Sequence, residues 1–292
     1  MKPTRPLQRF HPCAWHRAAG FTLVEMAVVV TLMAIVLTMG LRLLSATRDS
    51  AAWSETKVKQ ERIKGALLAY LRTNGRLPCP NSVAPWDGAE DTPCLVNAGR
   101  GIVPWQALGL SMGDVQDGWS NFFTYRVAND TPVSGSNWTI KVGATAFTLG
   151  ELTVPLATFA LSERSDAGVL GASLTPNPVV MIISHGKNGL GGRTVRGSVL
   201  LPMPTGADEL LNATTALPGA PPHFVTRVPT DVAAATGGAF DDLVAYMTPN
   251  HLLQPLLDDK TLKGVCQAYC AVPGPGCVAA AVPVGNPAPT CP

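Results

Sequence analysis

The chain has 292 residues, of which 46% are hydrophobic and only 14% are charged, against roughly 25% charged residues in an average soluble domain. Its 22 Lys and Arg residues nearly balance its 20 Asp and Glu residues, so the formal net charge is +2. This composition excludes an intrinsically disordered chain and a protein that binds nucleic acid through a basic surface. The length suffices for one large domain or two ordinary domains, each with its own hydrophobic core.

A basic leader precedes a long apolar segment at the start of the chain. Residues 1–20 contain basic but no acidic side chains, and residues 21–44 contain only two charged side chains, Glu25 and Arg42. As a helix, residues 21–44 extend about 36 Å at ~1.5 Å per residue, which exceeds the ~30 Å hydrocarbon core of a bilayer. Because basic residues stay on the cytoplasmic side, the sequence predicts a cytoplasmic leader and export of everything after residue 44.

A secretory signal peptide is the alternative for this region, because Leu44-Ser45-Ala46 ends in small residues that a signal peptidase accepts. The apolar run is, however, longer than the roughly 7–15 residues of such a signal. Glu25 also lies inside the run, where a carboxylate without a partner costs several kcal/mol. Both observations favour a retained membrane helix in which Glu25 has a partner.

The segment Gly20-Phe21-Thr22-Leu23-Val24-Glu25 resembles the processing site of type IV prepilins and type II secretion pseudopilins. The resemblance implies that a prepilin peptidase cleaves after Gly20, that the same enzyme methylates the new amino group of Phe21, and that Glu25 stays in the apolar helix. The amino group of Phe21 is then a cation near the membrane, and Glu25 of an adjacent subunit is an anion at the same depth. Pairing of these charges removes both desolvation penalties, so we expect Glu25 to direct assembly.

The helix is predicted to continue beyond the membrane as far as Asn74. Residues 45–74 contain no Pro and one Gly, and Asn74-Gly75 supplies the left-handed stop that commonly ends a helix. An amphipathic stripe with helical spacing indicates that one face packs against the rest of the protein. The stripe consists of Ile63, Ala66, Leu67 and Tyr70.

Short strand candidates, separated by Gly and Pro, follow this helix. They are rich in β-branched and aromatic residues and comprise residues 122–127, 138–142, 146–149, 179–183 and 243–246. The expected fold class is α+β with a pilin-like architecture, in which a long N-terminal transmembrane and amphipathic helix packs on an antiparallel β-sheet head. The expected regions are a removable leader (1–20), a transmembrane half-helix (21–44), an amphipathic half-helix (45–74), a β-rich head (75–271) and a Pro-rich, cysteine-tied tail (272–292).

Two segments of the head extend the resemblance. Residues 75–80 resemble the stretch that follows the long helix in pilin-like proteins. Residues 117–125 are similar to the Asp-Pro-Trp-Gly-x-x-Tyr-x-Tyr stretch of major pseudopilins, with Gly118 in place of Pro and Ser120 in place of Gly. Both segments are expected to contain turns.

A third segment, residues 184–192, resembles the Gly-rich loop that precedes a calcium-binding carboxylate pair in major pseudopilins. The resemblance implies that Asp241 and Asp242 are this pair, although residues 193–240 intervene where the family has only a few residues. Adjacent carboxylates and loop carbonyls can supply the six to eight oxygen ligands that Ca²⁺ prefers. The alternative is that Asp241 forms a turn after Gly237-Gly238 and that Asp242 lies in solvent. The sequence suggests no cofactor besides Ca²⁺.

The cysteines indicate disulfides in an exported domain. Cys13 leaves with the leader, so the processed chain keeps an even number of cysteines, which form stable disulfides outside the cytoplasm. Cys79 and Cys94 bracket one Pro-rich loop and are the predicted local pair. The other candidates, which allow three pairings, are Cys266, Cys270, Cys277 and Cys291. A zinc or redox site among them is disfavoured, because they have neither CxxC spacing nor a nearby His.

The sequence contains no hydrolase elbow, P-loop, zinc-protease or dinucleotide-binding motif, so we expect no enzymatic activity. Ser184 and His185 do not indicate a catalytic pair, because neighbours on a strand end point to opposite faces.

The sequence therefore predicts a pilin-like structural subunit of the bacterial inner membrane, with a periplasmic head. It would assemble into a type IV pilus, a type II secretion pseudopilus or a DNA-uptake filament, and the large head with residues 193–240 favours a minor pilin or pseudopilin. Implied partners are other pilin subunits, the prepilin peptidase and methyltransferase, an inner-membrane assembly platform and membrane lipid, whereas no nucleic acid is expected. The alternative is a singly anchored periplasmic binding or adhesion module that does not polymerise.

Overall fold

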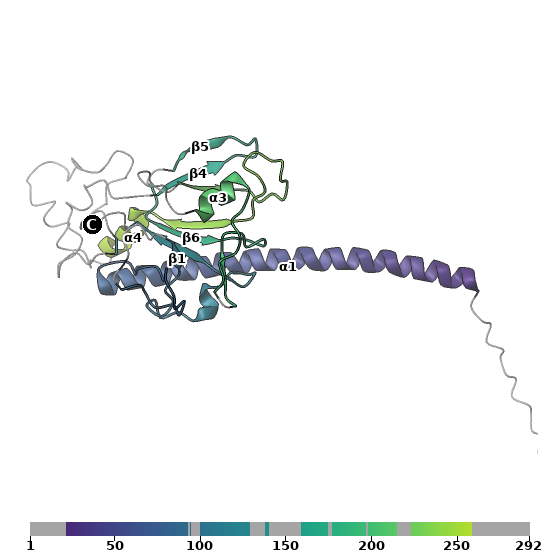
Figure 1. Cartoon of the computed structure of the whole chain (residues 1–292), viewed down its shortest axis with the longest axis horizontal. Helices are drawn as coiled ribbons and strands as arrows, with labels where there is room; N and C mark the ends of the chain where they lie inside the picture. Colours follow the sequence, from purple (N-terminus) through teal and green to yellow (C-terminus); the bar gives the residue numbers. More distant parts are fainter. Residues whose placement is uncertain are drawn as a thin grey trace, which may run out of the picture. The chain divides into compact units, whose positions relative to one another are not determined.

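The structure, a computed structural model, describes residues 22–92, 94, 100–128, 138–139, 159–174, 177–196, 198–214 and 223–258. The leader, residues 140–142 of the strand candidate over 138–142, the whole candidate over 146–149, and the tail over 272–292 lie outside the described residues. Trp138 and Thr139, the described part of the candidate over 138–142, form a turn and not a strand. The chain forms two compact units that divide between Arg48 and Asp49. The long helix α1 (Leu23–Asn74) contributes to both units (Figure 1).

In the first unit, α1 exposes a continuous series of large apolar side chains. Those between Leu23 and Leu37 are 40 to 90% exposed. The predicted helix over this region is confirmed. Within the part of the chain that the structure describes, no helix combines the length and the apolarity needed to cross a membrane.

In the second unit, residues 49–74 of α1 bury two of the four residues of the predicted stripe, whereas Ala66 and Tyr70 are half-buried. Ile63 and Leu67 are completely buried, and Leu71, one turn after Leu67, is 1% exposed. The side-chain amide of Gln60 donates hydrogen bonds to backbone carbonyls of two strands, at 3.1 and 3.0 Å. This half of α1 therefore packs on a sheet, as predicted.

The helix ends at the predicted stop. Gly75 has a φ of 65°, in the left-handed region that residues with a Cβ rarely adopt. Its N–H donates to the carbonyl of Leu71 at 2.9 Å, which satisfies one of the free carbonyls at the helix end.

The sheet against α1 has four antiparallel strands in the order β1-β3-β6-β9. We call it the first sheet; its strands are β1 (Gly101–Ile102), β3 (Thr124–Val127), β6 (Val180–Ser184) and β9 (Leu243–Met247). The strands predicted over 179–183 and 243–246 are confirmed. The candidate over 122–127 divides at Phe123 into β3 and β2 (Asn121–Phe122), and β2 pairs with β7 (Arg193–Thr194).

A second sheet has the order β5-β4-β8. It comprises β4 (Ala160–Arg164), β5 (Leu170–Ser173) and β8 (His223–Arg227). The prediction of an antiparallel head is wrong here, because β4 and β8 run parallel. Parallel strands need a long crossover, and the chain between Arg164 and His223, which includes α3 (Ala207–Ala213), provides one. Two further helices are the short η1 (Met112–Val115) and α4 (Pro249–Asp258), which follows β9.

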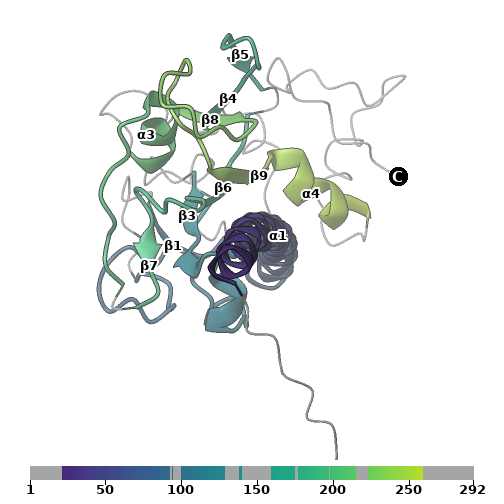
Figure 2. The same ribbon diagram turned by 90° about the vertical axis from the view of Figure 1, so that its right-hand side faces the viewer.

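The second unit has three layers. Figure 2, which looks along α1, shows β3, β6 and β9 between α1 and a layer that contains α3, β4 and β8. We call this third layer the α3–β8 layer. Arg126 on β3 connects the two sheets, because it donates to the carbonyl of Thr214 and its guanidinium lies 5.1 Å from the centre of the Phe224 ring. The residues that intervene between the Gly-rich loop and Asp241 thus supply α3 and β8 of this layer, whereas β4 comes from an earlier part of the chain.

Candidate functional site

The first candidate site is the start of α1. Gly20 and Phe21, where cleavage and methylation are predicted, lie outside the described residues. Glu25 accepts hydrogen bonds from the backbone N–H of Thr22 at 3.0 Å and from its hydroxyl at 3.1 Å. In return, Thr22 Oγ1 accepts from the backbone N–H of Glu25 at 3.2 Å.

This reciprocal pair is a capping box, which satisfies two otherwise free N–H groups at the start of a helix. Its Thr-x-x-Glu spacing is visible in the sequence and gives Glu25 a structural role in addition to the predicted subunit pairing. Glu25 remains exposed, so its carboxylate is accessible to a cation of another molecule.

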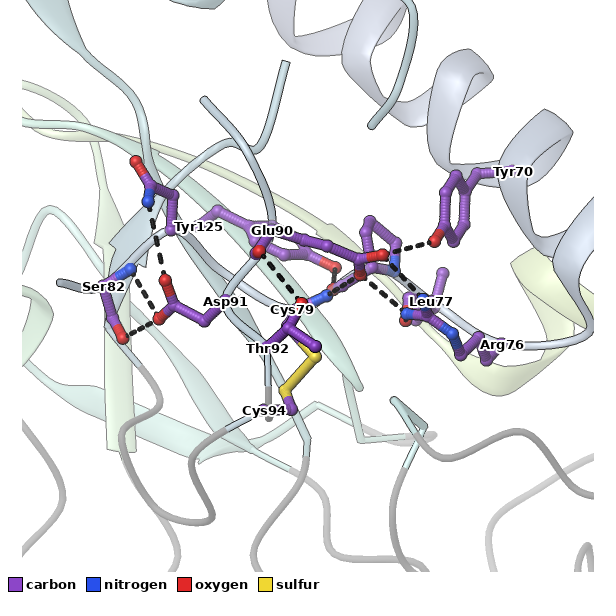
Figure 3. The surroundings of a disulfide bond; sticks show 12 residues. Tyr70, Arg76, Leu77, Cys79, Ser82, Glu90, Asp91, Thr92, Cys94 and Tyr125 are labelled. Carbon is purple, nitrogen blue, oxygen red and sulfur yellow. Dashed lines mark hydrogen bonds and ion pairs between the residues drawn. A yellow bond between two sulfur atoms is a disulfide. The ribbon is translucent and has the colours of Figure 1, made fainter. Parts of the chain in front are cut away.

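The second candidate site is the disulfide between Cys79 and Cys94, whose Cα atoms lie 5.5 Å apart (Figure 3). This is the predicted local pair. The other four candidates, Cys266, Cys270, Cys277 and Cys291, lie outside the described residues. Closing a 15-residue loop stabilises the folded state by about 3 kcal/mol through the lost entropy of the unfolded chain.

Glu90 fixes this loop to the end of α1. Its carboxylate accepts two hydrogen bonds from Arg76, at 2.7 and 2.6 Å, one from the Tyr70 hydroxyl at 3.0 Å and one from the backbone N–H of Cys79 at 3.1 Å (Figure 3). Burial alone would raise the pKa of Glu90, but these hydrogen bonds and the charge of Arg76 outweigh it and hold the pKa below its ordinary value. This network was not predicted from the sequence.

The third candidate site surrounds the Gly-rich loop over 184–192. At the end of β6, Ser184 donates to Asp117 at 2.7 Å, and Asp117 also accepts from the backbone N–H groups of Trp119 and Asn121, both at 2.9 Å. The two segments that resemble pseudopilins, 117–125 and 184–192, are therefore in contact.

Asp241 lies directly against the same loop. Gly186 has a φ of 57°, and a Cβ there would lie 2.2 Å from the carbonyl oxygen of Asp241, so only glycine permits this approach. Asn188 donates its backbone N–H to Asp241 Oδ2 at 2.8 Å. The structure thus brings the Gly-rich loop and Asp241 together across the intervening segment.

A cluster of three carboxylates forms at this contact. One ligand oxygen from each of Glu209, Asp241 and Asp242 lies within 4.8 Å of the others. The alternative that placed Asp242 in solvent is wrong, since this residue is only 4% exposed. Glu209, in the first turn of α3, is 2% exposed and was not predicted. Its only sequence signal is the acidic pair Asp208-Glu209 within residues 193–240.

The hydrogen bonds of the cluster leave two carboxylate oxygens without a partner. Glu209 Oε1 accepts from the backbone N–H of Asp241 at 2.9 Å and from the Asn188 amide at 3.1 Å, and Asp242 Oδ2 accepts from the Asn212 amide at 2.9 Å. Asp241 Oδ1 and Asp242 Oδ1 are buried but accept no hydrogen bond within the described structure. His185 Nδ1 is 3.6 Å from Asp242 Oδ1, which is too long for a hydrogen bond.

The electrostatics of the cluster favour a cation. Burial, followed by the charge of Asp242, raises the pKa of Glu209 to about 7. Burial is also the largest cause of the raised pKa of Asp241, and the charge of Asp242 adds to it. The oxygens of the three carboxylates are hard donors, so the cluster fits Ca²⁺ and not a metal that prefers sulfur or nitrogen.

Ser184 and His185 bond to different partners. His185 is fully buried, and its Nε2 lies 2.9 Å from the Thr124 hydroxyl, whereas Ser184 bonds to Asp117. These neighbours therefore belong to the polar interior between the sheets and do not form a nucleophile–base pair.

Comparison with protein-family models finds a prokaryotic N-terminal methylation motif at residues 15–41. No curated protein and no solved structure matches the chain. The matched residues include Gly20, Phe21 and Glu25, the three positions singled out by the prepilin resemblance. The chain therefore carries, over residues 15–41, a prokaryotic N-terminal methylation motif that coincides with the segment resembling the processing site of type IV prepilins and pseudopilins.

Proposed function

We propose that this chain is a minor pilin or pseudopilin that is cleaved after Gly20, methylated on Phe21 and assembled through its N-terminal helix into a type IV pilus or a type II secretion pseudopilus. The observation that carries the proposal is the methylation motif over 15–41, with Glu25 at the fifth position of the processed chain. Its partners are then other pilin subunits and an inner-membrane assembly platform.

Residues 21–44 are proposed to anchor the subunit in the inner membrane before assembly, with the head in the periplasm. Two observations support this placement: only two charged side chains occur between residues 21 and 44, and the large apolar side chains between Leu23 and Leu37 are exposed. Such a surface is unfavourable in water but favourable in lipid or against the same helix of other subunits.

The α3–β8 layer supports a minor subunit over the major one. It adds a second sheet and a helix beyond the four-stranded sheet that covers α1. This extra material makes the head larger than a compact repeating subunit requires, and a specialised subunit present in few copies has room for it.

A second proposed function is the binding of Ca²⁺ by Asp241 and Asp242. The supporting observation is the pair of buried carboxylate oxygens without a hydrogen-bond partner beside the Gly-rich loop. When bound, Ca²⁺ supplies positive charge that compensates the carboxylates. The protein residues hold the carboxylates in place through Asn188 and Asn212.

Assembly is tested by comparing Glu25→Ala with Thr22→Ala in cells that express the prepilin peptidase. Both changes remove the capping box, but only Glu25→Ala removes the carboxylate. We expect cleavage and N-methylation, measured by intact mass, to persist in both variants. Incorporation into sheared filaments should be lost only in Glu25→Ala. Normal incorporation of Glu25→Ala would instead support the singly anchored binding module.

A further inference from the structure

Helix α3 is fixed to its own sheet by two polar side chains. Asp208 is completely buried and accepts two hydrogen bonds from Arg164 on β4, at 2.6 and 2.7 Å, and one from Arg227 on β8 at 3.1 Å. Asn212 exchanges two hydrogen bonds with the backbone of Val225, both at 2.9 Å. Buried ion pairs and hydrogen bonds therefore join α3, β4 and β8 to one another.

Two polar side chains of α3 also reach toward the first sheet: the Asn212 amide donates to Asp242 at 2.9 Å, and Glu209 lies beside both aspartates. Glu209 meets Asp241 and Asp242, which directly precede β9, and Asn188, which follows β6. The carboxylate cluster thus spans the boundary between the α3–β8 layer and the first sheet. Glu209 comes from one side and the aspartates come from the other.

Without a cation, this boundary brings like charges together in a buried place. The neutral hydrogen bonds from the Asp241 N–H and the Asn188 amide hold Glu209 there, and they act against the repulsion among the three carboxylates. A bound cation replaces this net repulsion by attraction, because each carboxylate then has a positively charged partner. A ligand that binds only the docked arrangement stabilises that arrangement.

We infer that Glu209 is a third ligand of the proposed Ca²⁺ site and that the bound cation latches the α3–β8 layer onto the first sheet. This inference rests on the cation-binding part of the proposed function and adds a regulation to it: the external Ca²⁺ concentration sets how firmly the outer layer of the head is held. The 193–240 segment thereby contributes to the cation site and does not merely lengthen the loop before it.

The test uses the full chain, purified in detergent, with CaCl₂, with MgCl₂, or with a chelator alone. Thermal unfolding and calorimetric titration measure cation binding, and hydrogen exchange read by mass spectrometry measures docking of the layer. We expect Ca²⁺ to raise Tm by several degrees and to slow exchange in α3 and β8, with little change in β6. Magnesium should have a smaller effect, because it demands a stricter geometry.

The variant Glu209→Gln shows whether Glu209 binds Ca²⁺ or only supports the fold. Gln keeps an oxygen that accepts from the Asp241 N–H but carries no charge. We expect Tm to rise in chelator, because repulsion is relieved, and Ca²⁺ affinity to fall by about tenfold or more. The slowing of exchange in α3 by Ca²⁺ should disappear. Glu163→Gln, an exposed carboxylate on β4, is the matched control and should behave as the wild type.

The possible results distinguish the latch from the site itself. If the wild-type protein shows no heat of Ca²⁺ binding and no shift in Tm, the proposed Ca²⁺ function fails, and the latch fails with it. If the wild type and Glu209→Gln bind Ca²⁺ equally and exchange in α3 does not respond, the latch is wrong while a site at Asp241 and Asp242 stands. A lower Tm of Glu209→Gln in both chelator and Ca²⁺, at unchanged affinity, would assign Glu209 a structural role only. Hydrogen exchange of the wild-type chain decides the latch even if the variant does not fold.

Discussion

Glu25 and Glu209 are both proposed to pair with a cation, but they are held in place by contacts of different range in the sequence. Glu25 is exposed, and its hydrogen bonds come from Thr22, three residues earlier. Glu209 is buried, and its partners Asn188 and Asp241 are 21 and 32 residues away in the sequence. The first site is contained in one short motif, whereas the second exists only after two sheets have come together.

The largest expected effect comes from a substitution that weakens the attachment of α3 to β4 and β8, on which the position of Glu209 depends. Asp208→Asn leaves Arg164 and Arg227 without their buried counter-charge, and loss of one partner of a buried ion pair typically costs about 3–5 kcal/mol. We expect the free energy of unfolding, measured by denaturant titration, to fall by this amount.

A matched control for this change is Asp166→Asn, an exposed carboxylate in the turn after β4. It should alter stability by no more than about 0.5 kcal/mol. Equal effects of the two substitutions would contradict the dependence of the Glu209 site on buried ion pairs.

The disulfide joins residues 15 apart in the sequence, a separation between that of the Glu25 contacts and that of the Glu209 contacts. Replacing Cys79 and Cys94 together by Ser should lower the free energy of unfolding by about 3 kcal/mol, because the unfolded chain regains the freedom of a 15-residue loop. Thermal unfolding of the double variant, with the other cysteines unchanged, measures the loss. A double variant as stable as the parent protein would show that the loop is already ordered by Glu90 alone.

The regions that could be predicted from sequence share one property: their signals are local. The helix stop at Gly75, the strands β6 and β9 and the Cys79–Cys94 pair all follow from patterns within a few residues or one loop. Strand β5 exposes all four of its residues and so lacks an alternating apolar pattern. Helix α3 is only seven residues long, too short for a helical period to stand out.

The candidate cation site likewise contains residues that could be predicted from the sequence and one that could not. Asp241 and Asp242 could be identified because they are adjacent and because the Gly-rich loop resembles one in pseudopilins. Glu209 could not, since nothing in the sequence indicates that α3 folds back over the start of β9. The parallel pairing of β4 with β8, which positions α3, depends on a crossover that no local pattern specifies.

Acid should weaken the attachment of the disulfide loop through Glu90. The pKa of this carboxyl lies below its ordinary value of 4.5, so its contribution to stability is complete above that pH and is lost as the pH falls through the lower, folded-state value. We therefore expect Glu90→Gln to be less stable than the parent protein at neutral pH and to lose less stability below about pH 4.5. The effect should be smaller than that of removing the disulfide, because Glu90 is partly exposed. If both proteins lose the same amount of stability as the pH falls, Glu90 is not responsible for the acid sensitivity.

The smallest expected effect belongs to the local site. Thr22→Ala removes the cap of α1 but leaves the Glu25 carboxylate, and loss of a Thr cap typically costs about 1 kcal/mol of local helix stability. Because the cap holds only the first turn, we expect faster hydrogen exchange there and no change in the unfolding of the second unit. Faster exchange throughout α1 or a lower stability of the head would contradict this prediction. A local effect would show that Glu25 can be freed from Thr22 at little cost, as the proposed pairing with the amino group of an adjacent subunit requires.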